Sequence, residues 1–216
     1  MYRLIILLIL LFPNLLSSQL NNEDFGSWIR TDFSYGVNKK VSFNGRFELR
    51  TINNTTELKQ LFSEFSAKIK FNSFFRGSFA YRTKSVTKEY NNELQNRLHA
   101  DFTFRYKVGD LTFLLRNRTQ YNIIQNDINP FHERIRIKTA YKINKKIKAF
   151  LFNEFFFHLN SLSGPMHDKN RLGIGLEYKL NRSLFLGLKY LRIKELNTYN
   201  PQIMNVIGFG ITHKLN

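Results

Sequence analysis

The stretch VSFNGRFELRT, residues 41 to 51, changes character at every step. One set of alternate positions is apolar or small and the other is polar or charged: Val41, Phe43, Gly45, Phe47 and Leu49 against Ser42, Asn44, Arg46, Glu48 and Arg50. A period of two places successive side chains on opposite faces of an extended chain, whereas a helix repeats about every 3.6 residues. The segment therefore predicts a β-strand with one apolar and one charged face.

The same alternation recurs along nearly the whole chain. Residues 94–106 and 133–143 show it as clearly as residues 41–51, and helical spacing fits none of these windows. We expect eleven strands, at roughly 27–37, 41–51, 61–71, 75–83, 93–106, 111–121, 133–143, 147–158, 170–180, 184–193 and 202–215.

Short turns with a common signature separate alternate strands. The turn residues Asn38, Asn72, Gly109, Asn144, Asn181 and Asn216 are spaced by 34, 37, 35, 37 and 35 residues. Asn and Gly suit tight hairpins because a left-handed backbone costs least there. Longer loops are expected near 52–60, 84–92, 122–132, 159–169 and 194–201. The predicted fold is all-β, an antiparallel up-and-down barrel of about 10 to 12 strands.

The strand count leaves the closure of the barrel open. Eleven strands in one closed barrel make the first and last run parallel, whereas bacterial single-chain barrels have an even number. The second strand could pair with the last in a ten-stranded barrel, residues 19–26 could supply a twelfth strand, or the first strand could be misplaced. The sequence does not choose among these.

The N-terminus reads as an export signal. Arg3 precedes an apolar run from Leu4 to Phe12, and Ser17 and Ser18 follow Pro13 and two further leucines. This pattern predicts a secretory signal peptide over residues 1–18 and a barrel domain over 19–216. The net charge of +17 first suggests nucleic acid, but an exported protein meets little of it, so we expect no nucleic-acid partner.

Tyrosines indicate which face of the barrel meets lipid. Tyr35, Tyr106, Tyr141 and Tyr178 lie on the apolar face beside the short turns, and Tyr81, Tyr121 and Tyr190 lie on that face beside the long loops. Two aromatic girdles with aliphatic and Phe residues between them match a bilayer with two interfaces. This predicts a transmembrane barrel with short periplasmic turns and longer extracellular loops. The alternative is a secreted soluble ligand-binding barrel, whose apolar face would fill the interior.

Several short elements resemble a known family: Trp28, Glu48-Leu49-Arg50, Tyr81-Arg82, Arg116-Asn117-Arg118, Arg134-Ile135-Arg136 before Tyr141, Glu154-Phe155, and Asn170-Arg171-Leu172-Gly173 with Tyr178. The pattern is similar to an uncharacterised family of bacterial outer-membrane β-barrels carried as a domain of unknown function. The resemblance implies the outer membrane of a Gram-negative bacterium and a barrel fold, and it supplies no activity.

The charged face predicts a basic lumen. Its wall is expected to contain Arg46, Glu48, Arg50, Arg82, Arg97, Arg105, Arg116, Arg118, Arg134, Arg136, Glu154 and Arg171. A passage lined by one sign of charge attracts counter-ions, which favours a structural or small-solute role with an anion bias. The alternative is a filled lumen, in which Arg46, Arg50, Arg97, Arg105 and Arg171 pair with Glu48, Glu64, Asp101, Glu154 and Glu177.

Catalytic and metal signals are weak. His158 with Ser161 or Ser163, beside Glu154, is the nearest approach to an activated nucleophile and would suit an outer-membrane lipid-modifying enzyme of the acyl hydrolase or deacylase type. Neither a Gly-x-Ser-x-Gly nucleophile elbow nor the metal-binding spacing His-Glu-x-x-His occurs in the sequence, so we predict no enzyme, cofactor or metal. Expected partners are outer-membrane lipids, the barrel assembly machinery, and lipopolysaccharide at Lys59, Lys84, Lys88, Lys169 and Lys194.

Overall fold

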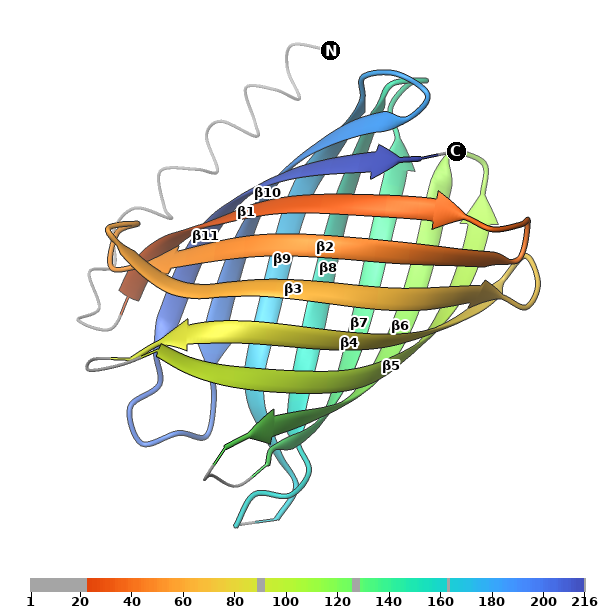
Figure 1. Cartoon of the computed structure of the whole chain (residues 1–216). Helices are drawn as coiled ribbons and strands as arrows, with labels where there is room; N and C mark the ends of the chain where they lie inside the picture. The colour runs from red at the N-terminus through yellow and green to blue at the C-terminus, as the bar shows by residue number, and fades with distance from the viewer. Residues whose placement is uncertain (1–22, 89–91, 126–128, 163, 216) are drawn as a thin grey trace.

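The chain forms a single closed barrel of eleven strands (Figure 1). The computed structural model describes residues 23–88, 92–125, 129–162 and 164–215, so the predicted signal peptide lies outside the described residues. The strands are β1 (Glu23–Gly36), β2 (Val41–Ile52), β3 (Glu57–Lys70), β4 (Phe75–Thr87), β5 (Asn92–Val108), β6 (Leu111–Ile124), β7 (Phe131–Lys142), β8 (Ile147–His158), β9 (Met166–Lys179), β10 (Leu184–Glu195) and β11 (Ile203–Lys214).

The all-β, up-and-down prediction is confirmed, with each strand antiparallel to its neighbour in sequence. Most strands are longer than the sequence predicted, because alternation fades near strand ends while backbone pairing continues; β5, for example, has 17 residues. Two of the predicted loops are much shorter. β2 ends at Ile52 and β3 begins at Glu57, and β4 ends at Thr87 and β5 begins at Asn92.

The barrel closes with an odd number of strands, so it matches none of the three alternatives that were considered to avoid a parallel pair. β1 pairs with β11 in parallel, from Glu23 opposite Ile203 to Ser34 opposite Lys214, and their arrows run the same way in Figure 1. A parallel ladder is only slightly less stable per residue than an antiparallel one. An odd number of strands is therefore physically accessible, as the 19-stranded mitochondrial barrel also shows.

The short turns form where predicted, but for a different reason. The side-chain Oδ1 of Asn38 accepts hydrogen bonds from the backbone N–H of Lys40 and Val41, at 2.8 and 2.9 Å. Asn72, Asn144 and Asn181 repeat this arrangement. None of these asparagines has a positive φ, whereas Gly109 has a φ of 55°; Asn216 lies outside the described residues. The asparagines therefore act as acceptors for backbone donors.

The barrel is apolar outside and charged inside. Phe43, Phe47, Phe102 and Phe104 are 40%, 57%, 46% and 49% exposed, which places them on the exterior. The tyrosines expected in the two girdles are all exposed as well: Tyr35, Tyr81, Tyr106, Tyr121, Tyr141, Tyr178 and Tyr190. A soluble barrel with an apolar core requires the reverse arrangement.

A small apolar cluster occupies part of the interior, in the half nearer the long loops. It consists of Trp28, Phe152, Leu191, Ile193 and Val206, with Phe150 and Met204 packed against it. Gly173 makes room for it, since a Cβ at this position would come within 2.4 Å of the Phe152 ring. Gly208 likewise makes room for the Lys189 side chain, and Gly210 lies beside the Arg30 guanidinium.

No helix among the described residues is long and apolar enough to cross a membrane.

Candidate functional site

Charged side chains form a continuous row around one side of the lumen. The strand register places Asp32 beside Arg46, Arg46 beside Glu64, and Glu64 beside Arg82. Arg46 contacts Asp32 at 2.7 Å and Glu64 at 3.6 Å, and Arg82 Nε donates to Glu64 at 2.8 Å. Directly opposed charges stabilise a strand pair when their signs differ. The row therefore helps to hold β1 to β4 in register.

Glu154 is the centre of a second group on the opposite wall. Its side chain is fully buried, and four arginines from three strands, β6, β7 and β9, reach it. The guanidinium nitrogens of Arg116, Arg134, Arg136 and Arg171 lie 2.5, 2.8, 2.8 and 3.3 Å from its carboxylate oxygens. One carboxylate thus forms ion pairs with four guanidiniums, so the group has a local excess of positive charge.

Asp101, on β5, joins the Glu154 group through Arg116. Arg118 donates to both of its oxygens, at 2.6 and 2.7 Å, and Arg116 lies 3.7 Å from it. Charge-assisted bidentate pairs of this kind are the strongest side-chain hydrogen bonds.

Aromatic rings also support the lumenal arginines. Arg50 lies over Trp28 at 3.7 Å, Arg82 over Phe62 at 3.8 Å, and Arg134 over Phe156 at 4.2 Å, each measured to the ring centroid. A guanidinium over an aromatic face is attracted to the ring, more strongly when it is desolvated. These contacts fix the guanidiniums against the wall.

The predicted wall residues divide into two sets. Ten of them line the central cavity: Arg46, Glu48, Arg50, Arg82, Arg97, Arg116, Arg118, Arg134, Arg136 and Arg171. Glu154 lies beneath its arginines, and Arg105 shares the Asp101 face of β5 but does not line the cavity. Acidic side chains belong to the wall as well: Glu48 and Glu154 were among the predicted residues, and Asp101 also lines the cavity.

The filled-lumen interpretation is correct for some of its pairs. Arg50 pairs with Glu48 and Arg171 with Glu154, and Arg46 reaches Glu64. Arg97 instead donates to the amide oxygen of Asn122 at 2.5 Å. Among the described residues, no carboxylate lies within ion-pair distance of Arg97 or Lys189. Part of the basic charge therefore remains uncompensated.

A cavity of about 710 Å³ lies between these walls. Fifteen Lys and Arg side chains line it against six Asp and Glu, and the buried Glu154 makes a seventh acid. The resulting excess of eight positive charges has the sign that the sequence predicted. Cavities of this size hold small organic ligands.

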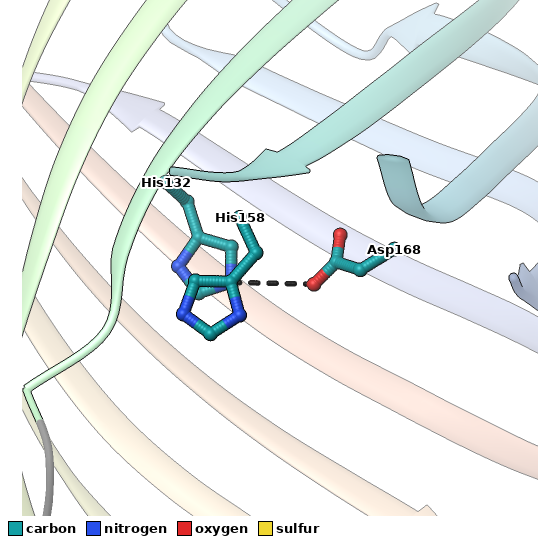
Figure 2. A group of neighbouring side chains, drawn as sticks. All are labelled: His132, His158 and Asp168. Atoms are coloured by element: carbon teal, nitrogen blue, oxygen red, sulfur yellow. Dashed lines mark ion pairs between the residues drawn. The ribbon is translucent and has the colours of Figure 1, made fainter. Parts of the chain in front are cut away.

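Three residues that the sequence did not connect meet near the long loops. His132, His158 and Asp168 come from β7, β8 and β9, and Figure 2 shows both imidazoles facing the carboxylate. Their spacing in sequence, 26 and 10 residues, matches no short metal motif, so only the strand register reveals them.

His158 and Ser161, the residues named in the enzyme alternative, contact other groups in the structure. The Ser161 hydroxyl donates to the Gly164 carbonyl, and His158 stacks on His132 with ring centroids 4.6 Å apart. Glu154 is held by the arginines, and Ser163 lies outside the described residues.

An up-and-down barrel with an apolar exterior, exposed tyrosines towards both ends and a charged interior belongs to the class of transmembrane β-barrels. The chain is a member of the protein family of unknown function DUF2490, whose model matches residues 25–203. The predicted resemblance to an uncharacterised barrel family is thereby confirmed.

Solved structures of outer-membrane proteins show a similar fold. OmpT of Vibrio cholerae, expressed in the outer membrane, is 13% identical, with a TM-score of 0.43 and coverage of 72% of this chain and 54% of that one. The same protein folded in vitro is 13% identical, with a TM-score of 0.44 and coverage of 76% and 53%. The chain thus spans about half the length of these OmpT chains. No curated protein matches it.

Proposed function

We propose that the protein is exported by its N-terminal signal and embedded in the outer membrane of a Gram-negative bacterium. The observation that carries this proposal is the exposed apolar surface, where Phe47, Phe65 and Phe79 are 57%, 59% and 57% exposed at mid-strand positions. Soluble monomers rarely expose continuous apolar patches of this extent. Lipid acyl chains solvate such an apolar surface. Closure of the barrel pairs the backbone N–H and C=O groups of the strand edges, which lipid cannot hydrogen-bond.

We further propose that the lumen binds small anions and lets them pass. The support is the excess of cationic side chains around the cavity, together with Arg97 and Lys189, which lack a carboxylate partner among the described residues. A narrow polar space of one net sign concentrates counter-ions. The charged rows attract anions, while the surrounding carboxylates keep the binding weak enough for release.

The shape of the cavity limits what can pass. Its lining runs from Ser34 and Lys214, near the short turns, to His132 and Asp168, near the long loops. The apolar cluster around Trp28 takes up part of the lumen in the loop-side half. This combination favours small inorganic anions or small carboxylates over bulky solutes.

Planar-bilayer recording of the refolded protein tests the proposal. In a KCl gradient we expect a reversal potential that shows preference for chloride, and a weaker preference after Arg97→Gln combined with Lys189→Gln. Lys39→Gln, in the exposed turn between β1 and β2, is the matched control and should leave selectivity unchanged. Cation selectivity, or no conductance from correctly folded protein, would refute permeation.

The partners follow from this location. Anionic lipopolysaccharide is proposed to contact the lysines at the loop end, of which Lys59 and Lys194 are exposed. Lys88 and Lys169 are also engaged with Glu93 and Glu195, at 2.5 and 3.3 Å. Insertion is proposed to use the barrel assembly machinery.

A further inference from the structure

Two imidazoles and one carboxylate converge on neighbouring strands where the lumen approaches the long loops. His132, His158 and Asp168 each offer a ligand atom, and these atoms all lie within 4.8 Å of one another. His132 Nε2 is 3.3 Å from Asp168 Oδ2. The two imidazole rings are nearly parallel, inclined by 8°, and both present an edge to the carboxylate (Figure 2).

The backbone brings these side chains together in two ways. His132 and His158 are direct partners in the β7–β8 register, so their rings lie side by side. On β9 the register shifts: Phe156 pairs with Lys169 while Phe157 pairs with His167, which leaves Asp168 as the extra residue of a bulge. Asp168 and Lys169 both line the cavity, although strict alternation would send only one of them inward.

The bulge therefore turns Asp168 towards the histidines. Bulges often re-aim a side chain in this way beside functional sites.

The three residues also leave polar atoms without partners. His132 Nδ1, His158 Nε2 and Asp168 Oδ1 are buried, and none has a hydrogen-bond partner within the described part of the chain. A buried donor or acceptor without a partner is unfavourable, and most such atoms in folded proteins are satisfied by protein, water or an ion. On His132 the unsatisfied nitrogen is Nδ1, whereas Nε2 lies beside Asp168, so these atoms show a polar cluster whose hydrogen-bonding capacity is not filled within the described residues.

We infer that His132, His158 and Asp168 form a binding site for a divalent transition-metal ion of the zinc class. Two imidazoles and a carboxylate are a ligand set that such ions prefer, and three protein ligands leave a coordination position open. Here that position faces the cavity, because His132 and Asp168 line it.

The geometry and the charges indicate how tightly the ion is held. Bonds of about 2.0–2.2 Å to a tetrahedral ion would require the ligand atoms to lie closer together than 4.8 Å, so the side chains would have to move on binding. With neutral imidazoles, the ion and one carboxylate leave a net charge of +1 near Arg134, two residues along β7. The site is therefore exchangeable, unlike a closed structural zinc site.

Calorimetric titration of ZnCl₂ into the full chain tests the inference. The barrel is purified in detergent without a polyhistidine tag, and each variant is first checked for heat-modifiable gel migration. We expect one Zn²⁺ per barrel and an affinity weaker by at least about tenfold in Asp168→Asn and in His158→Ala. His213→Ala, at the short-turn end of β11, removes an imidazole outside the cluster and should bind as the parent does.

Cobalt(II) provides a readout that needs no variant. Co²⁺ in a tetrahedral site of nitrogen and oxygen ligands absorbs visible light far more strongly than the octahedral aqua ion, because geometry governs these bands. An increase in absorbance that Zn²⁺ reverses supports the site. Failure of the folded parent to bind up to about 1 mM Zn²⁺, or unchanged binding in folded Asp168→Asn, shows instead that the cluster is a His–Asp ion pair. Anion permeation is tested separately, so either proposal can fail alone.

Discussion

Replacing Glu154 with glutamine removes the carboxylate that, among the described residues, alone contacts both Arg134 and Arg171. The amide keeps the volume and one acceptor, but it cannot neutralise the four guanidiniums that lie within 3.3 Å of the carboxylate. Removing one partner from a buried ion pair costs about 3–5 kcal/mol. We expect a loss of that size here, because Glu154 is fully buried and Arg134 is only 7% exposed.

Denaturant unfolding of the detergent-solubilised barrel measures this loss. The single tryptophan, Trp28, reports unfolding from inside the lumen, since Arg171 lies 5.0 Å from its ring. The matched control is Glu177→Gln, which removes a carboxylate paired with Lys138 and Lys148 but 39% exposed. Exposed pairs contribute roughly 0–1 kcal/mol, so the control should change the free energy of unfolding little.

A double variant separates lost attraction from uncompensated repulsion. Adding Arg134→Gln to Glu154→Gln removes one of the arginines left without a counter-charge, so part of the lost stability should return. Phosphate should also stabilise Glu154→Gln more than the parent, because an anion can take the place of the carboxylate. If Glu154→Gln unfolds at the same denaturant concentration as Glu177→Gln, the argument for a central carboxylate fails.

Three further changes test the fold. Gly173→Ala should lower the free energy of unfolding by about 1–3 kcal/mol, because the added methyl group overlaps the Phe152 ring. Gly187→Ala should be tolerated, since the nearest atom to its added methyl group is 3.8 Å away, and denaturant unfolding compares the two variants. Asn144→Ala should cost about 1 kcal/mol by removing the acceptor of two turn N–H groups, and Asn144→Asp should restore it in the same assay. Phe47→Arg, at the middle of the lipid-facing side of β2, should cost about 2–4 kcal/mol in vesicle refolding while Phe47→Leu costs little; equal refolding yields would contradict a lipid-facing exterior.

The strands, the turns and the two faces of the barrel could be predicted from the order of the residues alone. The alternation over residues 41–51 depends only on the period of an extended chain, so it can be read without knowing which strands meet. The turn asparagines act within three residues of themselves, so their positions were predictable even though their role as acceptors was not. The family resemblance relied on the same local signals.

The closure of the barrel and the contacts between its charged side chains could not be predicted, and they became known from the folded chain. The parallel β1–β11 ladder joins residues some 180 positions apart, and no local signal specifies that pairing. Register, in turn, placed four arginines around Glu154 and left Arg97 with Asn122. The bulge at Asp168 is a one-residue irregularity, and it alone brings that carboxylate to the histidines. Alternation tells which face a side chain occupies, but its neighbours on that face depend on strand pairing, which is set by contacts distant in sequence.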